Sequence, residues 1–304
     1  MDRVRVIGVD VGGTKVATAV LDDRTLEVHP PVPTTLTDED ALLAQLVGLV
    51  RGLGRADAVG LGVPSVVDWA TGTIRSSVNI PLHGVPLRER LERELGMPVF
   101  VDNDASVAAL AEAFDEDLEP VARHLVMITL GTGVGGGVVI DGRVFRGATG
   151  AAPELGHVVM GADLQHGAPP ADDRPPHPGT FEALASGTAL DHLARPKGWG
   201  DGEDVVRAAG AGDERALDVL RVLGERLGVG IANCINLFDP ELVVVGGGVS
   251  NAGELVLAPA RDVAWTYVIE GVGTRTRIER ARHGPQAGVR GAALLARQEM
   301  EAHG

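Results

Sequence analysis

The chain of 304 residues contains a single cysteine, so it cannot form an internal disulfide. That residue, Cys234, lies in the apolar helical stretch GVGIANCINLF, which predicts a buried and unreactive thiol. The sequence also lacks any apolar run near the ~20 residues that cross a bilayer, and its N-terminus is a charged strand where a signal peptide would be apolar. These absences predict a cytoplasmic protein with no membrane partner.

Positive charge is scarce as well. Lys15 and Lys197 are the only lysines, and the formal net charge is −15 with an isoelectric point near 5.0. Such an acidic chain is repelled by nucleic acid and by anionic membrane surfaces, so neither is expected as a main partner. The length permits a substantial core and favours two domains.

Two glycine-rich turns are set between apolar runs, far apart in the chain. The first is Asp10-Val11-Gly12-Gly13-Thr14-Lys15, after VRVIGV, and the second is the LGTGVGGG run at 130–137, after HLVMIT. Each pattern predicts a β-hairpin, and glycines in the turn allow successive backbone N–H groups to converge on an anion. Two such turns suggest a nucleotide held by two related halves.

Each turn also has a plainer interpretation as a tight hairpin turn without a ligand. The second run contains G-x-G-x-x-G, but a dinucleotide-binding fingerprint should open a helix, and the following VVIDGRVF is typical of a strand. The Walker pattern G-x-x-x-x-G-K-[ST] is absent, which excludes the common P-loop NTPases.

Strand-like and helix-like segments alternate along the chain. A meander opens it, a helix at 39–53 precedes the strand AVGLGVPS, and a helix at 87–95 precedes the strand PVFVDND. After the acidic stretch DEDLEPVAR the same scheme begins again at HLVMITLGTG. Two α/β halves, each led by a hairpin, predict the duplicated RNase H-like fold of actin-type ATPases, with two domains around a central cleft.

The predicted boundaries follow from that scheme. The first domain covers 1–115 and is completed by a C-terminal helix at about 285–304, and the second domain covers 116–284. Within the second, residues 162–179 are rich in proline and aspartate and predict a loop.

Ordered motifs along nearly the whole chain resemble the ROK family of bacterial sugar kinases, sugar-responsive repressors and uncharacterised reading frames. They are DVGGTK at 10, GVPSVVD at 62, NIP at 79, PVFVDNDASVAALAE at 98, LGTGVGGG at 130, APELGH at 152, FEALASG at 181 and LFDPELVVVGGGVS at 237. Each motif alone is weak, but their shared order is specific. Within the family they are most similar to the ATP-dependent glucokinases of actinobacteria.

Phosphoryl transfer from ATP to a sugar hydroxyl needs a base near that hydroxyl, a metal on the phosphates and donors around the transferring group. Asp104, which follows the strand VFV at the start of a helix, is either a capping carboxylate or that base. The resemblance favours the base, because Asp104 matches the catalytic aspartate of the family's VENDAN-type motif. An ordinary carboxylate suffices for this role.

Carboxylates and amides suit sugar recognition, because they accept or exchange paired hydrogen bonds with adjacent hydroxyls. The resemblance implies that these contacts come from Asn103, Asp104, Glu154, His157 and Glu182, and more weakly from Asn79. Without the resemblance, Glu182 is interpreted as a helix-surface charge and Glu154 as a capping residue.

For ATP the resemblance implies two phosphate-binding turns and one turn against adenosine. These contain Gly12, Gly13, Thr14 and Lys15, then Gly131, Thr132 and Gly133, then Gly246 and Gly247. Asp10 is expected to orient Mg²⁺ through water, since Mg²⁺ keeps much of its hydration. The alternative for Gly246 and Gly247 is an ordinary turn from a strand into a helix.

The sequence departs from the family in one important place, besides smaller departures at Ser65 and His83. ROK kinases usually carry a CxCGxxGC zinc motif after the GH segment, but here that interval holds no cysteine and is longer and proline-rich. Three of the four usual ligands are thiolates, so zinc is expected to be absent. The alternative is a substitute site made by His157 with His166, His177, Asp172 or Asp173.

These features favour an ATP-dependent hexokinase of carbohydrate metabolism that phosphorylates a 6-hydroxyl, with glucose the first candidate. Mannose, fructose, allose and N-acetylmannosamine remain open, as does a sugar-binding homologue that lost turnover with its zinc loop. A DNA-binding repressor is disfavoured, because only nine residues precede Asp10 and the repressors carry a winged helix-turn-helix there. The resemblance also implies a homo-oligomer, namely a dimer.

Overall fold

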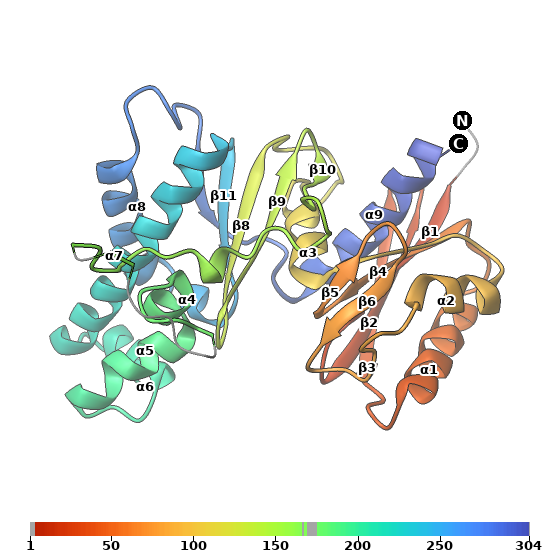
Figure 1. Cartoon of the computed structure of the whole chain (residues 1–304), viewed down its shortest axis with the longest axis horizontal. Coiled ribbons are helices and arrows are strands. Elements are labelled where there is room, and N and C mark those ends of the chain that lie inside the picture. The colour runs from red at the N-terminus through yellow and green to blue at the C-terminus, as the bar shows by residue number, and fades with distance from the viewer. Residues whose placement is uncertain (1–3, 166, 169–174, 304) are drawn as a thin grey trace. The chain divides into compact units, whose positions relative to one another are not determined.

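The computed structural model describes residues 4–165, 167–168 and 175–303 and divides into two compact units (Figure 1). Unit 1 comprises Met1–Arg123, Gly137–Pro153 and His283–Gly304, and unit 2 comprises His124–Gly136 and Glu154–Arg282. The segment Gly137–Pro153, which the sequence placed in the second domain, therefore groups with the first. A long-range ion pair from this segment to Asp102, described below, is one physical reason.

Unit 1 is built on a five-stranded sheet of order β3-β2-β1-β4-β7. Strands β1, β2 and β3 form an antiparallel meander, while β1, β4 and β7 run parallel. A separate hairpin joins β5 to β6. The bounds are β1 Arg5–Val11, β2 Lys15–Asp22, β3 Thr25–Pro33, β4 Ala58–Val63, β5 Ser65–Asp68, β6 Thr73–Ser77 and β7 Val99–Asn103.

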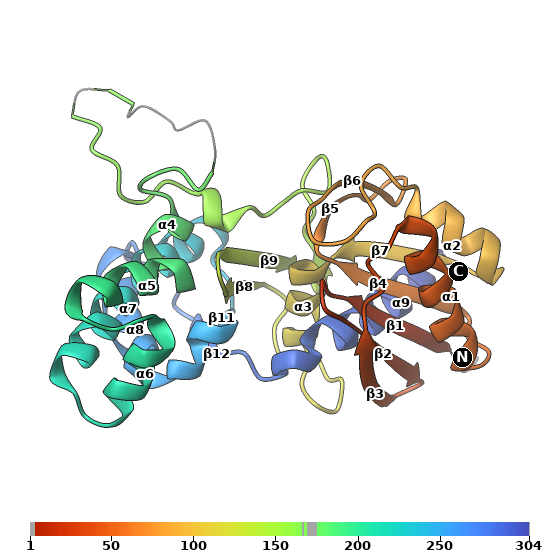
Figure 2. The same cartoon turned by 90° about the horizontal axis from the view of Figure 1, so that it is seen from below.

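Helices cover both faces of this sheet. On one face α1 (Glu39–Gly52) and α2 (Leu87–Leu95) share a leucine- and valine-rich core with the strands, and Figure 2 shows the two helices side by side. On the other face α3 (Asp104–Glu112) and α9 (Ala287–His303) pack together. A Cβ on Gly60 would overlap the α9 backbone, so this glycine allows α9 to lie directly against β4.

The second sheet has the order β10-β9-β8-β11-β12, which repeats the order of the first: a hairpin-led meander, then two further strands. Strands β8, β11 and β12 run parallel, as β1, β4 and β7 do. This repeat confirms the predicted duplication. The bounds are β8 Leu125–Leu130, β9 Val134–Ile140, β10 Arg143–Val144, β11 Leu242–Gly246 and β12 Arg277–Arg280.

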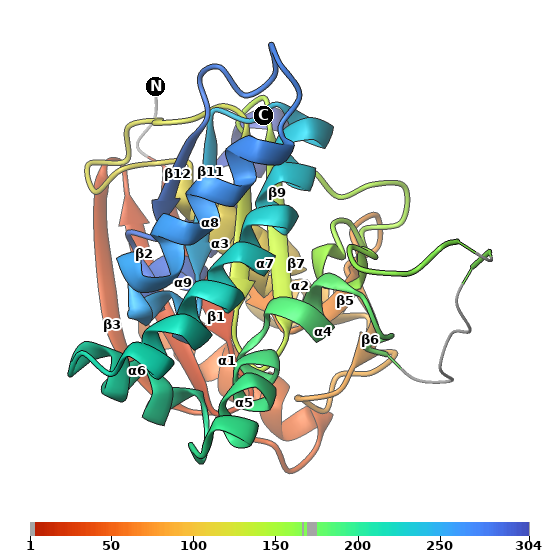
Figure 3. The same ribbon diagram turned by 90° about the vertical axis from the view of Figure 1, so that its left-hand side faces the viewer.

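The helices of unit 2 centre on one long helix, α7 (Glu214–Phe238), which lies beside α8 (Glu254–Tyr267) (Figure 3). Cys234 of α7 is buried, and burial raises the pKa of its thiol to about 12, so the predicted inert thiol is confirmed. The other helices are α4 Phe181–Ala185, α5 Gly187–Ala194 and α6 Gly202–Gly210, with 3₁₀ turns η1 Leu155–His157, η2 Arg195–Lys197, η3 Gly248–Ala252 and, in unit 1, η4 Gly284–Gln286. Across the described ranges, no helix combines the length and apolar character needed to span a bilayer.

Candidate active site

The first glycine turn joins β1 to β2 as the sequence predicts. The Gly12 N–H donates to Lys15 O at 2.9 Å and closes the hairpin. The Thr34 hydroxyl, after β3, donates to Gly12 O at 2.7 Å and holds the turn from the side. The turn is therefore a fixed element, with the Lys15 side chain exposed.

Asn79, far from this turn in sequence, lies beside it in space. A Cβ on Gly13 would stand 3.4 Å from Asn79 Cβ, which is ordinary contact distance. Asn79 is exposed. The structure thus brings together the first predicted phosphate turn and the weakest of the predicted sugar contacts.

Parallel strands align three positions at one edge of the unit 1 sheet. Asp10 of β1 pairs in register with Gly62 of β4, and Gly62 pairs with Asp102 of β7. Open α/β sheets bind ligands at the carboxyl ends of such strands. The predicted residues Asn103 and Asp104 follow Asp102 directly and begin α3 at this same edge.

Asn103, not Asp104, is the cap of α3. Its Oδ1 accepts hydrogen bonds from the N–H groups of Ala105 at 2.9 Å and Ser106 at 3.2 Å, and its amide donates to Ser65 O at 3.4 Å. Asp104 is the first helical residue, and its Oδ1 accepts from Ala105 N at 2.8 Å. The capping interpretation of Asp104 is therefore wrong, because its neighbour satisfies the helix end.

Two carboxylates at this edge of the unit 1 sheet, Asp10 and Asp104, have raised pKa values. Burial raises the pKa of Asp104, against the effect of the backbone hydrogen bond from Ala105. Burial, followed by the charge of Asp104, raises the pKa of Asp10 to about 6, and Lys15 opposes that shift. Asp10 also lies against the first turn of α9, where a Cβ on Gly288 would overlap its carboxylate. Such an acid pair at a strand edge suits proton transfer and cation binding.

The second glycine turn, after β8, contacts the start of α5. The Gly187 N–H donates to Gly131 O at 2.7 Å, and the Thr188 hydroxyl donates to Thr132 O at 2.8 Å. The chain leaves this turn as strand β9. The G-x-G-x-x-G run therefore opens a strand, and the hairpin prediction is confirmed over the dinucleotide fingerprint.

Glu182 of α4 reaches this same turn. Its Oε2 accepts the N–H of Val134 at 2.8 Å, and a Cβ on Gly133 would overlap its carboxylate. Glu182 is partly buried. The interpretation of Glu182 as a helix-surface charge is therefore wrong, since its side chain is fixed on the glycine turn.

A pocket of about 610 Å³ in unit 2 begins at this turn. Its lining combines backbone of the glycine turn, the first turns of α5 and α6, and the η3 turn after β11. Gly247 has a φ of +82°, packs against Leu130 and directs the chain into η3. The predicted turn from a strand into a helix therefore also forms a wall of the pocket. The lining residues are Gly131, Thr132, Gly187, Thr188, Leu190, Asp191, Gly202, Glu203, Val206, Arg207, Gly248, Val249, Asn251 and Ala252.

Glu154 directly precedes the short helix η1, and His157 is the last residue of that helix. Glu154 makes no side-chain cap there, so its capping interpretation is wrong, and its Oε2 lies 3.9 Å from His157 Nε2. Both side chains are about half exposed or more, at 59% and 44%.

The alternative metal site was predicted around the same histidine. No group of three or more His, Cys, Asp or Glu side chains within the described ranges is placed to hold a metal ion. Three of the candidates for a substitute zinc site, His166, Asp172 and Asp173, lie outside those ranges, and the fourth, His177, lies within them. Zinc content therefore stays a prediction.

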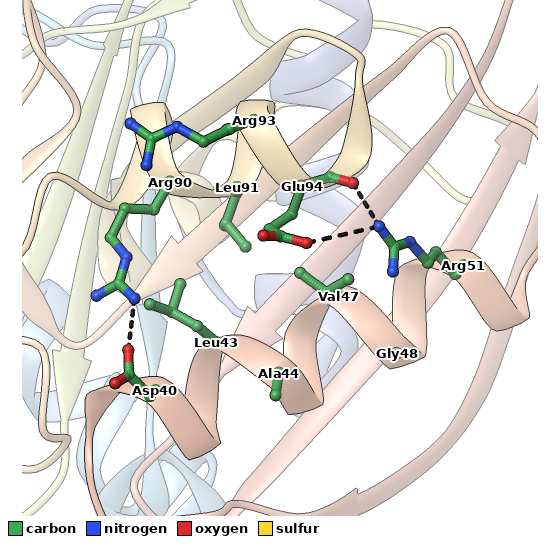
Figure 4. Close-up of a pocket in the computed structure, with 10 residues that line it drawn as sticks. All are labelled: Asp40, Leu43, Ala44, Val47, Gly48, Arg51, Arg90, Leu91, Arg93 and Glu94. Carbon is green, nitrogen blue, oxygen red and sulfur yellow. Dashed lines mark hydrogen bonds and ion pairs between the residues drawn. The ribbon is translucent and has the colours of Figure 1, made fainter.

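A second pocket, of about 410 Å³, lies between α1 and α2 in unit 1 (Figure 4). It is rich in arginine, yet each guanidinium already has an acidic partner: Arg90 binds Asp40 at 2.5 Å, and Arg51 binds Glu94 at 3.6 Å. Arg93 pairs with Glu89 in the same way. These neutralised arginines make the groove a poor anion site, and it contains none of the predicted residues.

A sequence model of the ROK family matches residues 6–299. The chain belongs to the ROK family. A glucokinase of Streptomyces coelicolor is 36% identical over 96% of this chain and 97% of its own length. An N-acetyl-D-glucosamine kinase of Vibrio vulnificus is 35% identical over 95% and 98%. The crystal structure of a ROK glucokinase from Streptomyces griseus, in complex with glucose and AMPPNP, superposes with a TM-score of 0.73 at 34% identity, over 97% of this chain and 99% of that one.

Several residues of this ROK chain that shape the site were missed from the sequence. Gly288, which leaves room for the Asp10 carboxylate, and Thr188, which holds the second turn, are brought in by α9 and α5. The only available signal was the FEALASG motif, whose last residue, Gly187, directly precedes Thr188. Gly288 carried no signal, because the space that it leaves is defined by a strand nearly three hundred residues away in the chain.

Proposed function

We propose that this ROK protein is an ATP-dependent kinase that transfers a phosphoryl group to the 6-hydroxyl of a hexose, with Asp104 as the base. The observation that carries the proposal is the helix cap of α3. Asn103 satisfies the helix end, so the partly buried Asp104 carboxylate remains at the carboxyl edge of the sheet beside Asp10. Membership of a family with glucokinases over nearly the full length supports the same reaction.

Asp104 accepts the proton of the sugar hydroxyl as the oxygen attacks the terminal phosphorus of ATP. A raised pKa makes the Asp104 carboxylate a stronger proton acceptor. We propose that Asn103, Glu154, His157 and Glu182 bind the sugar hydroxyls, with Asn79 in a minor role.

The carboxylates of Asp10 and Asp104 in unit 1 fit a magnesium ion. Asp10 is partly buried, its pKa is raised to about 6, and the charge of a second carboxylate, Asp104, acts on it. A divalent cation would stabilise this arrangement. We propose that Asp10 holds Mg²⁺ through water. When bound, the ion supplies positive charge to the phosphate oxygens.

The residues proposed to bind ATP are those of the two glycine turns and those that line the pocket of unit 2. Gly12, Gly13, Thr14 and Lys15 would bind terminal phosphates, as would Gly131, Thr132 and Gly133. The pocket behind the second turn presents apolar side chains and two acids, and Arg207, its one arginine, is paired with Asp204 at 2.9 Å. This lining suits a nucleoside and disfavours a further polyanion, so we assign it to adenosine, with Gly246 and Gly247 shaping one wall.

Glucose is the first candidate sugar, and N-acetylglucosamine is the second, because relatives of both names are similar to this chain at 34–36% identity. A coupled assay of ADP release over glucose, N-acetylglucosamine, mannose, fructose and N-acetylmannosamine, with Mg²⁺, tests the assignment. We expect kcat/KM for glucose to exceed the others by at least ~10-fold. A larger value for N-acetylglucosamine would replace glucose, and no turnover with any sugar would refute the kinase.

We also propose a zinc-free homodimer that works in the cytoplasm, where ATP is available. Family membership supports the dimer, and so does an apolar patch at the ends of α7 and α8. The patch exposes Leu237, Trp265, Tyr267 and Ile269 by 44–70%, in a chain with 3% aromatic residues. Light scattering of Tyr267→Glu should give monomers where the unchanged protein gives dimers, and elemental analysis should find no stoichiometric zinc.

A further inference from the structure

A buried charged cluster lies behind the strand end that carries Asn103 and Asp104. Arg146 Nε donates to Asp102 Oδ2 at 2.7 Å, and Arg146 Nη2 donates to Glu299 Oε1 at 3.2 Å. The three side chains are only 16%, 4% and 9% exposed. The guanidinium also lies over the ring of Trp69, 3.4 Å from its centroid. Arg146 is thus fixed by two carboxylates and one aromatic face.

Asp102 uses both carboxylate oxygens, and the second leads toward the site. While Oδ2 binds Arg146, Oδ1 accepts the N–H of Asn103 at 2.9 Å. Burial raises the pKa of Asp102, and the charge and hydrogen bond of Arg146 act against that shift. Arg146 therefore favours the charged form of Asp102 and fixes the orientation of this carboxylate, whose other oxygen binds the Asn103 backbone.

The Asn103 backbone in turn fixes the base. Asn103 caps α3 through Ala105 and Ser106, and Asp104 is the intervening helical residue. A shift of the Asn103 peptide would rotate the first turn of α3 and displace the Asp104 carboxylate. A displacement of about 1 Å at a reacting group can cost about 10²-fold in rate.

The arginine comes from the segment of unit 1 that precedes another predicted sugar contact. Arg146 O accepts the Ala152 N–H at 3.2 Å, which folds the loop back on itself, and Gly150 in this loop, with a φ of +83°, packs against Val67 of β5. Two residues after Ala152 the chain reaches Glu154. Arg146 thus contacts the base-bearing strand through its guanidinium and the start of the APELGH motif through its backbone carbonyl.

We propose that Arg146 is a positioning residue for phosphoryl transfer, which acts through Asp102 to hold Asn103 and Asp104 in their reactive orientation. Arg146 contacts none of the residues proposed to bind ATP phosphates. Its loss is therefore expected to lower kcat and to leave ATP binding unchanged. This inference rests on the proposed role of Asp104 as the base.

The test is Arg146→Lys, which keeps the charge and loses the planar fork that binds two carboxylates and stacks on Trp69. We expect kcat to fall by ~10- to 100-fold, with the KM for ATP within about twofold. Hydrogen exchange should also become faster in peptides that contain the Asn103 amide, because its acceptor is released. A kcat within about twofold of the unchanged enzyme would overturn the inference.

Arg88 provides a matched control. Its guanidinium lies over the same Trp69 ring, at 5.3 Å from the centroid, and donates to the carbonyls of Trp69 and Ala70 instead of to Asp102. Arg88→Lys therefore removes comparable packing from the ring without releasing the base-bearing strand. We expect its kcat to stay within about twofold. An equal loss of kcat in both variants would show a general packing effect and would overturn the positioning role.

A triple variant covers the case in which Arg146→Lys does not fold. Arg146→Met with Asp102→Asn and Glu299→Gln removes all three charges of the cluster, so none of them is left buried without its partner. We expect a folded protein with kcat still reduced by at least ~10-fold, because the neutral side chains no longer fix the Asn103 amide. Full kcat in this variant would overturn the inference. If Asp104→Asn is inactive while these variants are fully active, the proposed reaction stands and only the role of Arg146 is lost.

Discussion

The two glycine turns occupy equivalent places in a duplicated topology, yet their chemistry differs. Asp10 stands two residues before the first glycine of its turn and pairs with Gly62 of the neighbouring parallel strand. In unit 2 the equivalent residue is Thr129, which pairs with Gly246. The two repeats share the pairing register and a glycine on the neighbouring strand, whereas the acid, Asp10, is replaced by Thr129 in unit 2. We infer that unit 1 performs the acid–base chemistry and that unit 2 recognises the nucleoside, while the glycine turn of each unit binds phosphate.

The largest expected effect tests the acidic half. Asp104→Asn keeps the shape of the side chain and removes the proton acceptor, so kcat should fall by at least ~100-fold with little change in the KM for sugar. Asp38→Asn is the control, because Asp38 is an acid at the start of α1 and caps that helix through Ala41. Steady-state kinetics of both variants measure this effect. A near-normal rate for Asp104→Asn would show that Asp104 is not the base.

A pair of substitutions within the second glycine turn tests the role of unit 2. A Cβ on Gly133 would overlap the Glu182 carboxylate, while a Cβ on Gly131 meets nothing within 4 Å. Gly133→Ala should therefore displace Glu182 and lower kcat/KM by ~10- to 100-fold, since the bond to Val134 is lost.

Gly131→Ala leaves the protein itself undisturbed, so any effect must come from the ligand. If ATP approaches this turn closely, the KM for ATP should rise several-fold while the KM for sugar stays constant. Equal, small effects of both substitutions would contradict the assignment of unit 2 to the nucleotide.

The pH dependence of stability sharpens the contrast between Asp10 and Thr129. The folded state raises the pKa of Asp10 from 3.8 to about 6, so its contribution to stability is present below about pH 4 and is lost as the pH rises through about 6. Asp10→Asn should therefore stabilise the metal-free protein by up to about 3 kcal/mol at pH 8 and change it little at pH 4.

Urea unfolding at both pH values measures this difference. Asp262→Asn, at an exposed position of α8, serves as the control and should show no pH-dependent gain. Added Mg²⁺ should stabilise the unchanged protein more than the Asp10→Asn variant. A variant that is less stable than the unchanged protein at pH 8 would mean that Asp10 is already compensated inside unit 1.

The smallest expected effect concerns the support of the second turn. Thr188→Ala removes the hydrogen bond to Thr132 O, which is worth about 1 kcal/mol, so the KM for ATP should rise about fivefold. The KM for sugar should not change. Thr266→Ala, whose hydroxyl bonds only along α8 to Asp262 O, is the matched control. A change in the KM for sugar alone would indicate that this turn contacts the sugar and not the nucleotide.

Much of the fold was predictable because its signals are local. Apolar runs on either side of glycines predicted both hairpins, and helix α2 begins and ends at the residues expected from the sequence. Its end is marked by Gly96 in the left-handed conformation, a signal that needs no tertiary contact. The ROK motifs identified the family for the same reason, since each is a short continuous segment.

The grouping of Gly137–Pro153 with unit 1 was beyond the sequence. The segment follows a strand of the second repeat, and its assignment depends on Arg146 reaching Asp102 and Glu299, 44 and 153 residues away. Neither partner is marked by local pattern, because a buried ion pair needs only two complementary side chains brought together by the rest of the fold.

The sequence by itself determined the duplicated α/β topology, the two glycine turns and the set of polar residues available for phosphoryl transfer. Only the tertiary structure decided what those residues do. It gave the helix cap to Asn103 and left Asp104 free of that task, it fixed Glu182 on Val134, and it placed Asp10 against Gly288. The physical reason is that a polar side chain has several possible partners within reach, and packing of distant segments selects among them.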